Sequence, residues 1–311
     1  MGFLYLLEDI RMPILNEFML LITHLGEETA FLVVALIVFW CVDKRRGYLL
    51  MSVGFLSTMA NQVMKLWFRI PRPWVLDPEF TILEQAREAA AGYSFPSGHT
   101  TSAVATFGSL AATSRKKSTI ALCVLLAVLV GFSRMYIGVH TPADVLVGAL
   151  TSILLIMVLR KVPYNGRGMD ILVLVMLASA AGFMAFVQLY PFPADVDAHN
   201  LASGMKNAYT MVGCMTGVLV VYHVEKKYVN FTTRAVWWAQ ILKVVFGLAL
   251  VLAVKEGLRS PLEAAFGDPL IARTVRYFLI VVAAGFVWPM TFRFFFKLGK
   301  GRGGKNELRY H

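Results

Sequence analysis

Long apolar runs separated by short polar stretches make up most of this chain. Runs of about 17–25 apolar residues are typical of helices that cross a membrane. We therefore predict an all-α, polytopic transmembrane helical bundle of about nine spans, at residues 29–42, 47–67, 99–113, 118–135, 143–159, 169–189, 206–223, 235–254 and 274–294. The run at 99–113 is short and contains several hydroxyl groups, which favours a position inside the bundle.

The N-terminal residues have a different pattern. Apolar positions recur at helical spacing between residues 3 and 23, but Glu8 and Asp9 interrupt them. This pattern predicts an amphipathic helix on the membrane surface, and the early acids argue against a cleavable signal peptide. We expect four parts: an interfacial helix at 1–28, a core at 29–162, additional transmembrane helices at 163–296 and a basic tail at 297–311.

The composition supports a membrane protein. Of the 311 residues, 58% are hydrophobic and only 16% are charged, whereas a soluble domain needs a more polar surface. Cys41, Cys123 and Cys214 lie in apolar runs without paired spacing. We therefore predict that the cysteines pack in the interior and form neither a disulfide framework nor a metal site.

The basic residues are unevenly distributed along the chain. The net charge is +11, and nine spans would place 18 of the 30 Lys and Arg residues, but only four of the 19 Asp and Glu residues, on one face of the membrane. The positive-inside rule makes that face cytoplasmic. We therefore predict an integral plasma-membrane protein with its N-terminus outside and its C-terminus in the cytoplasm. The positive charge is then a topology signal, and we predict no binding of nucleic acid.

Three polar stretches reach the outer face in this topology. The first is "KLWFRIPRPW" (65–74), in which Lys65 and Arg72 lie at the end of a span. Cations this close to an apolar core either anchor the helix end at the interface or meet an anion. This stretch alone leaves both interpretations open.

The second stretch is "YSFPSGHT" (93–100). Pro96 ends an extended approach, so a helix begins at Ser97 or Gly98 with free N–H groups that can bind an anion. The Ser97 hydroxyl adds a donor, and Gly98 lets a ligand come close to the backbone. His99 lies in the first turn, where it either faces that ligand or is an ordinary surface histidine.

The third stretch is "SRMYIGVHTPAD" (133–144). Thr141 is predicted to cap a helix that has proline at its first position. Asp144 could close a capping box with Thr141, or it could reach the ring of His140 and leave the other ring nitrogen free as a nucleophile. Arg134 could equally be an interfacial arginine, and His140 a polar loop residue.

Together the three stretches contain the groups that phosphoryl transfer requires. Lys and Arg can neutralise the charge on the transferring phosphoryl oxygens where no metal does so. The two histidines and the carboxylate can supply a nucleophile and a proton donor. The carboxylate cluster that magnesium needs is missing from these stretches. The sequence therefore predicts a phosphoryl-transfer site with no metal and no cofactor.

The three stretches also resemble a known signature. K-x6-R-P (Lys65 to Pro73), P-S-G-H (Pro96 to His99) and S-R-x5-H-x3-D (Ser133 to Asp144) look like the three motifs of the type 2 phosphatidic acid phosphatase superfamily, over residues 45–160. That superfamily also includes lipid phosphate phosphatases, undecaprenyl diphosphate phosphatases, glucose-6-phosphatase and vanadium haloperoxidases.

The resemblance implies a role for each residue. His140 would attack phosphorus and form a phosphohistidine, Asp144 would orient His140, and His99 would protonate the leaving oxygen and later activate water. The phosphate oxygens would be held by Lys65, Arg72, Ser97, Gly98 and Arg134.

The resemblance leaves the substrate open. The chain continues for three or four spans beyond the usual core of about six, and the predicted topology is similar to that of glucose-6-phosphatase. Our first hypothesis is a phosphatase for a lipid-linked phosphate, of the isoprenoid diphosphate or phosphatidate type. We expect membrane lipids to surround the protein. The alternatives are a phosphatase for a small soluble sugar phosphate and a non-catalytic lipid transporter. The intact His99, His140 and Asp144 argue against a transporter, and the membrane spans argue against a haloperoxidase.

The segment 74–95 bears on the choice between lipid and sugar. A short interfacial helix from about Thr81 to Ala90 and a series of apolar side chains would suit a substrate whose tail stays in the lipid; these side chains are Trp74, Val75, Leu76, Phe80, Ile82 and Leu83. A sugar phosphate needs hydroxyl-binding groups there, for which the obvious acceptors are Asp77, Glu79 and Glu84. The alternative is that the segment simply packs over the bundle.

Overall fold

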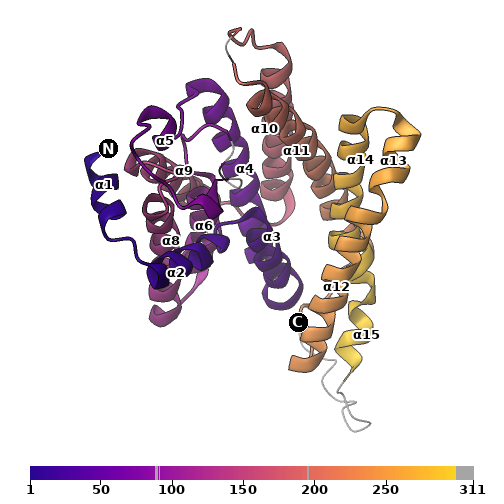
Figure 1. The fold of residues 1–311 in the computed structure, drawn as a ribbon. Helices are drawn as coiled ribbons and strands as arrows, with labels where there is room; N and C mark the ends of the chain where they lie inside the picture. Colours follow the sequence, from indigo (N-terminus) through magenta and orange to yellow (C-terminus); the bar gives the residue numbers. More distant parts are fainter. Residues whose placement is uncertain (88–89, 91, 195, 299–311) are drawn as a thin grey trace. The chain divides into compact units, whose positions relative to one another are not determined.

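The computed structural model describes residues 1–87, 90, 92–194 and 196–298. These residues form helices joined by loops, with no strand among them (Figure 1). They divide into two compact units: the first is Met1–Ala35 with Tyr48–Val212, and the second is Leu36–Gly47 with the residues from Gly213 onward. The all-helical class predicted from the apolar runs is confirmed.

The helical elements have the following bounds in chain order. The α-helices are α1 (Gly2–Asp9), α2 (Pro13–His24), α3 (Glu28–Ile37), α4 (Lys44–Phe68), α5 (Pro73–Leu76), α6 (Gly98–Ala103), α7 (Ser109–Thr113), α8 (Lys117–Tyr136), α9 (Pro142–Leu159), α10 (Gly166–Leu189), α11 (Ala198–Val224), α12 (Trp237–Gly257), α13 (Arg259–Phe266), α14 (Pro269–Val282) and α15 (Phe292–Lys297). Short π or 3-10 segments extend or connect them: η1 (Val38–Val42), η2 (Glu84–Ala86), η4 (Val104–Gly108), η5 (Glu225–Val229), η6 (Ala283–Val287) and η7 (Trp288–Thr291).

Five helical stretches of the described chain are long and apolar enough to cross a membrane: α8, α9, α10, Trp237–Phe266 and Pro269–Lys297. A sixth arises if α2 and the stretch Glu28–Val42, which are bent by 53°, count as one broken span. The predicted number of nine is therefore not confirmed. Two further predicted spans form α4 and α11, of 25 and 27 residues, and polar side chains such as Asn61 and Lys65 make α4 less apolar than a typical span.

The N-terminal residues form two helices, and not the single amphipathic helix predicted over 3–23. Met12 is extended, as the residue before a proline prefers to be, and Pro13 begins α2. α2 packs against α8, with Met19 and Ile22 buried. The helical spacing of the apolar residues predicts the type of structure here, but not the break before the proline.

The helix over residues 98–113 lies inside the first unit. α6, η4 and α7 follow one another without a break and pack against α8 and α9 (Figure 1). Thr100 and Thr101 are almost fully buried, as predicted for a helix inside the bundle. Gly148 permits the close approach of α9, because a Cβ there would lie 2.7 Å from the Ser97 carbonyl oxygen.

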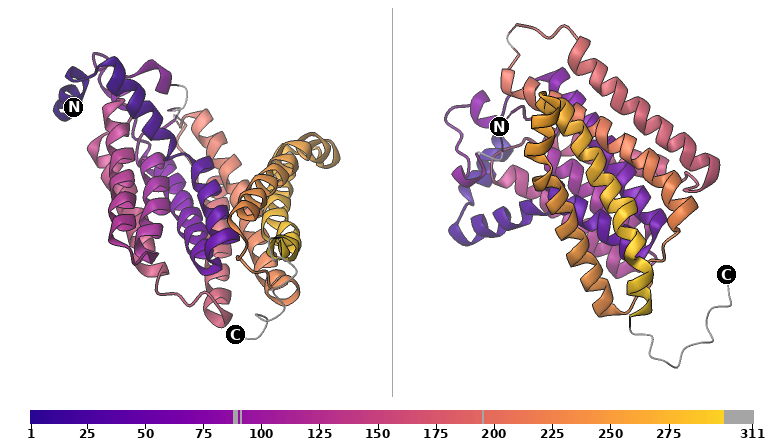
Figure 2. Two further views of the ribbon diagram at one scale, coloured as in Figure 1. Left: turned by 90° about the horizontal axis from the view of Figure 1, so that it is seen from below. Right: turned by 90° about the vertical axis from the view of Figure 1, so that its right-hand side faces the viewer.

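In the second unit, α12 packs against both α14 and α15, which follow one another in the stretch Pro269–Lys297, so that α12 lies beside this stretch (Figure 2). Two lysines of this unit have partners within it. Lys44 is paired with Glu225 at 2.6 Å. Lys243 is fully buried and donates from its Nζ to the Thr233 carbonyl at 3.2 Å. These contacts give the two lysines a structural role.

The interfacial helix predicted from Thr81 to Ala90 is largely absent. Among the described residues of this segment, η2 and Ala90 are in 3-10 conformation, and residues 88–89 lie outside the described residues. Leu83 is extended and its N–H donates to the Ile137 carbonyl at 3.1 Å, so a contact with a neighbouring loop holds the start of the segment out of a helical conformation. The prediction of a helix in this segment is wrong because tertiary contacts outweigh the local pattern.

The apolar side chains of the same segment are divided between interior and surface. Phe80 and Ile82 are buried and pack with Leu4 of α1. Val75 and Leu76 remain 60% and 55% exposed. The alternative that the segment packs over the bundle is therefore correct for Phe80 and Ile82, whereas α5 keeps an apolar surface.

Candidate active site

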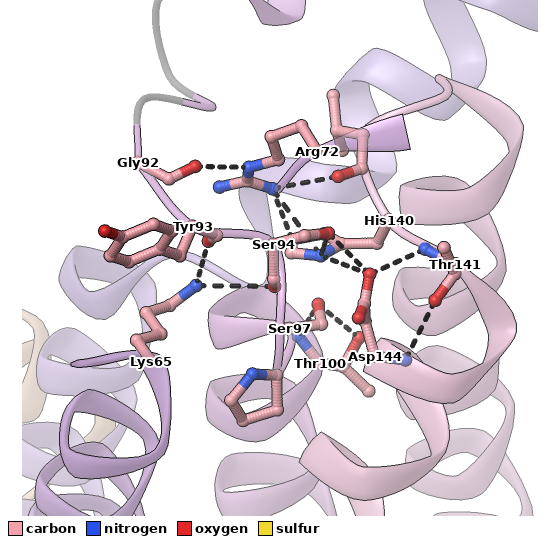
Figure 3. A network of polar contacts seen from close by, with 12 residues as sticks. Lys65, Arg72, Gly92, Tyr93, Ser94, Ser97, Thr100, His140, Thr141 and Asp144 are labelled. Carbon is pink, nitrogen blue, oxygen red and sulfur yellow. Dashed lines mark hydrogen bonds and ion pairs between the residues drawn. The ribbon is translucent and has the colours of Figure 1, made fainter. Parts of the chain in front are cut away.

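The first unit brings residues of all three motifs together (Figure 3). Lys65 lies near the C-terminal end of α4, and Arg72 directly precedes α5. Ser97 directly precedes α6, His140 lies in the loop before α9, and Asp144 lies in the first turn of α9. Each side chain is at or near a helix end, so the ends of four helices can contribute to one small region.

Two backbone carbonyls outside the motifs hold the first pair of cations. Lys65 Nζ donates to the Tyr93 carbonyl at 2.7 Å, and Arg72 Nε donates to the Gly92 carbonyl at 2.9 Å (Figure 3). Two consecutive residues of the segment before α6 therefore orient a lysine and an arginine that come from different elements.

Asp144 has both of the contacts that the sequence left open. Its Oδ2 accepts from the Thr141 N–H at 2.7 Å, and its own N–H donates to Thr141 Oγ1 at 3.3 Å, which completes the capping box of α9. The same Oδ2 lies 3.4 Å from His140 Nδ1 and accepts from Ser94 Oγ at 2.5 Å. One carboxylate thus caps a helix and lies beside the histidine ring. Ser94 is a site residue that the motifs do not include.

The contacts of His140 with Asp144 and Arg72 indicate where the ring proton lies. Arg72 Nη1 donates to the Val139 carbonyl at 2.9 Å and lies 3.0 Å from His140 Nε2 and 3.5 Å from its Nδ1. A carboxylate can only accept hydrogen bonds and a guanidinium group can only donate them, so the Asp144 carboxylate beside Nδ1 favours the ring proton on Nδ1 and leaves Nε2 unprotonated. His140 therefore presents an unprotonated nitrogen to the arginine.

The surroundings of His140 keep its ring neutral. The side chain is almost completely buried, and burial is the main cause of a pKa well below the ordinary 6.5; the positive charges of Arg72, Arg134 and Lys65 lower this pKa further. Burial also lowers the pKa of Arg72, to about 10, while the Asp144 carboxylate opposes this shift. Arg72 therefore remains protonated at neutral pH. A neutral imidazole among cations is suited to attack an anionic substrate.

The start of α6 has the features predicted for an anion site. Ser97 is its N-cap: the Oγ accepts from the Thr100 N–H at 3.4 Å and from the Thr100 hydroxyl at 2.9 Å, which leaves the hydroxyl proton of Ser97 for a further acceptor. The nearest neighbour of a Cβ at Gly98 would be Asn61 Oδ1, at 3.9 Å, so a ligand has room beside this glycine. The Ser97 N–H donates to the Asp144 carbonyl at 3.0 Å and joins this helix to α9.

The corner between α2 and α3 holds the two remaining motif residues. Arg134 is 2% exposed, and its Nη1 donates to Thr23 Oγ1 at 2.6 Å. Gly26 packs against His99, because a Cβ at Gly26 would lie 2.8 Å from the His99 carbonyl oxygen. In the part of the chain that the structure describes, the side chains of Arg134 and His99 are not hydrogen-bonded to the other motif side chains. The motifs do not reveal the contribution of Thr23.

The cysteines and acidic residues do not form a metal centre in the described part of the chain. Cys123 and Cys214 are buried and Cys41 is partly buried, and no disulfide joins any of them in the described chain. Among the described residues, no group of three or more His, Cys, Asp or Glu side chains is placed to hold a metal ion.

Comparison with known proteins decides the family. The sequence pattern of the PAP2 superfamily matches residues 46–167, and that of the PAP2 superfamily phosphatase, transmembrane extension, matches residues 209–301. Phosphatidylglycerophosphatase B of Bacillus subtilis (strain 168) is 32% identical over 164 residues, which are 49% of this chain and 76% of that protein. The chain belongs to the PAP2 superfamily.

Two other relatives extend over a similar part of this PAP2 protein. Undecaprenyl-diphosphatase BcrC of Bacillus subtilis is 31% identical over 144 residues, which are 46% of this chain and 72% of that protein. A probable sphingosine-1-phosphate phosphatase of Dictyostelium discoideum is 34% identical over 164 residues, which are 48% of this chain and 39% of that protein. No solved structure gives a significant match. The family predicted from the three motifs is confirmed, and this PAP2 protein is a phosphatase and an integral membrane protein.

Proposed function

We propose that this PAP2 phosphatase removes a phosphate group from a lipid-linked substrate, of the isoprenoid diphosphate or phosphatidate type, through a phosphohistidine on His140. The observation that carries the proposal is the 3.0 Å contact between Arg72 and the unprotonated Nε2 of His140. An arginine in this place would bind the phosphate and hold it in front of the nucleophile. Relatives named phosphatidylglycerophosphatase and undecaprenyl-diphosphatase support a lipid substrate.

The reaction would proceed in two displacements. In the first, His140 Nε2 would attack phosphorus while the bond to the leaving oxygen breaks, and His99 would give its proton to that oxygen. Asp144 would stabilise the positive charge that the phosphorylated ring gains. In the second, His99 would take a proton from a water molecule, which attacks the phosphohistidine and releases inorganic phosphate. The phosphate oxygens would be bound by Lys65, Arg72, Arg134, the Ser97 hydroxyl and the Gly98 N–H.

The surface near Arg72 supports a substrate with an apolar tail. Trp67 and Phe68 at the end of α4 are 52% and 53% exposed, and Val75 and Leu76 of α5 are similarly exposed. These four side chains lie within a few residues of Arg72 on both sides along the chain. They offer an apolar surface to an acyl or isoprenoid chain while the phosphate is held by the cations.

Two of the three acids that a sugar could use favour the same choice. Asp77 accepts a hydrogen bond from the Tyr5 hydroxyl at 2.9 Å, and Glu84 is paired with Arg87 at 2.7 Å. A sugar hydroxyl would have to displace these partners before it could bind either carboxylate. This displacement lowers the free energy gained when a sugar phosphate binds.

We expect kcat/KM for an isoprenoid or diacylglycerol phosphate to exceed that for glucose 6-phosphate by at least about tenfold, which is about 1.4 kcal/mol of transition-state preference. The release of inorganic phosphate by the purified protein, in one detergent and at one pH, measures both values. Equal or faster hydrolysis of glucose 6-phosphate would contradict the lipid assignment and favour a sugar phosphatase.

We also propose that the site lies on the extracytoplasmic side, which the distribution of Lys and Arg supports. Single cysteines in place of Asp77 and Asp195, of which Asp195 lies outside the described residues, in a variant that lacks the three native cysteines, should react with an impermeant maleimide on intact cells. Cysteines in place of Lys116 and Asn230, which are exposed positions near the other ends of the helices, should react only after the cells are lysed. The reverse pattern of labelling would place the site in the cytoplasm.

A further inference from the structure

The connection between α10 and α11 reaches the active site, although it lies between the two regions that match the family, 46–167 and 209–301. Asn200, in the first turn of α11, accepts through its Oδ1 from the Tyr93 N–H at 3.0 Å. The Asp197 N–H donates to the Tyr93 hydroxyl at 3.1 Å. The segment that orients the cations of the site is therefore held from its other side by the beginning of α11, within the first unit.

The side chain of Asn200 is itself fixed in one orientation. Its backbone N–H and its Nδ2 both donate to Asp197 Oδ1, at 2.7 Å and 2.8 Å. A carboxylate can only accept, so the amide nitrogen of Asn200 faces Asp197 and the amide oxygen faces Tyr93. Asn200 thus offers a preorganised acceptor to the Tyr93 N–H.

The peptide group between Gly92 and Tyr93 connects Asn200 to the site. Its N–H donates to Asn200 Oδ1, and its carbonyl accepts from Arg72 Nε at 2.9 Å. The peptide group is planar, so a rotation that breaks one of these hydrogen bonds also displaces the other. Asn200 and Arg72 therefore hold opposite ends of a single rigid unit.

Gly92 explains why this peptide group needs a restraint. Its φ is +85°, a conformation that favours glycine, and a residue without a side chain gives the adjoining peptide groups more freedom to rotate. A Cβ at Gly92 would also collide with Asn200 Oδ1. Glycine is required for the close approach of Asn200, and the hydrogen bond from Asn200 restricts the rotation that glycine allows.

We propose that Asn200 is a positioning residue of the active site, which fixes the Gly92–Tyr93 peptide group and through it the orientation of the Arg72 guanidinium toward His140. The inference rests on the proposed function, in which Arg72 binds the phosphate. It gives α11, which lies beyond the phosphatase core, a role in the reaction. Without Asn200 the peptide group can rotate, the Gly92 carbonyl moves away from Arg72, and phosphate meets a guanidinium that is less well oriented.

Substitution of Asn200 in the full-length protein tests this role. Asn200→Ala should lower kcat/KM for a lipid phosphate by about tenfold. The matched control is Asn207→Ala, which removes the same side chain about two turns further along α11 and should keep kcat/KM within about twofold of wild type. Thermal unfolding and gel filtration check that each variant is folded. If Asn200→Ala does not fold, Asn200→Ser is measured in its place. The serine side chain is too short for its hydroxyl to reach the Tyr93 N–H, so the same loss is expected.

A double-mutant cycle separates positioning of Arg72 from a general effect on the fold. Arg72→Lys keeps a positive charge but lacks the Nε–H that meets the Gly92 carbonyl. In that background the Asn200 substitution should change kcat/KM by less than about twofold, because the contact it supports is already gone. A merely structural role would give the same loss in both backgrounds.

Equal losses in the two backgrounds, or no loss from Asn200→Ala in otherwise wild-type protein, would overturn the inference. Failure of the proposed function would give a different result, because the wild-type protein would then not hydrolyse lipid phosphates at all. The cycle is then measured with para-nitrophenyl phosphate, for which the same pattern of coupled losses is expected and the same uncoupled losses would refute the role of Asn200.

Discussion

Replacement of His140 with alanine should lower turnover by several orders of magnitude in a protein that remains folded. The imidazole is the nucleophile of the proposed reaction, so its loss removes the whole two-step pathway and does not merely weaken one contact. The neighbours of the ring keep other partners, since Arg72 also donates to the Gly92 carbonyl and Asp144 also accepts from the Thr141 N–H. The surroundings of the missing ring should therefore persist.

The covalent intermediate gives a direct measurement. Rapid quenching of wild-type protein with a labelled substrate should trap phosphate in an acid-labile, base-stable bond, and His140→Ala should trap none. Trapping should continue in excess EDTA, because Lys65, Arg72 and Arg134 supply the positive charge. The control is His223→Ala, the loss of an exposed histidine in the second unit, which should leave turnover near normal.

Two results would contradict this mechanism. Near-normal turnover of His140→Ala would mean that another group is the nucleophile. Activity that is lost in EDTA and restored by magnesium would mean that the cations of the site do not suffice. The first result tests the covalent step, and the second tests the charge that supports it. Either part of the mechanism can therefore be refuted while the other part holds.

The three motifs predict the reacting side chains of the site but not the backbone that holds them. Lys65 and Arg72 donate to the carbonyls of Tyr93 and Gly92, and because every residue has a carbonyl, no pattern of residue types marks these two. Asn200 is 107 residues away from Tyr93 in sequence, so only the folded chain connects them. Gly92 is the one local signal, since a glycine that precedes a motif by a few residues can mark a close approach.

Fold prediction succeeds or fails for a similar reason. The ends of α8, α9 and α10 lie within three residues of the predicted spans 118–135, 143–159 and 169–189, because a continuous apolar run defines both ends of a span. The segment 81–90 has apolar residues at a helix-like spacing, but Ile82 is buried against α1 without forming a helix. Spacing identifies residues that will be buried, and it does not identify the element that buries them.

Replacement of Asp144 with asparagine should separate the two contacts of this carboxylate. An asparagine oxygen can still accept from the Thr141 N–H and from Ser94 Oγ, so the cap of α9 should be kept and the thermal midpoint should change by less than about 3 °C. The amide is neutral, however, and the His140 ring 3.4 Å away would lose its counter-charge. Both side chains are 2% exposed, so water cannot replace that charge when the ring is phosphorylated. Turnover should fall by about 100-fold or more, which is about 2.7 kcal/mol.

The matched control is the same substitution at another helix cap. Asp268 caps α14 in the second unit, where it accepts from the Leu270 N–H at 2.7 Å. Asp268→Asn should leave turnover unchanged, because an asparagine caps a helix as well as an aspartate does. Normal turnover of Asp144→Asn would mean that this carboxylate only caps α9. A large loss of turnover in Asp144→Asn alone, at an unchanged thermal midpoint, would assign the effect to the negative charge beside His140.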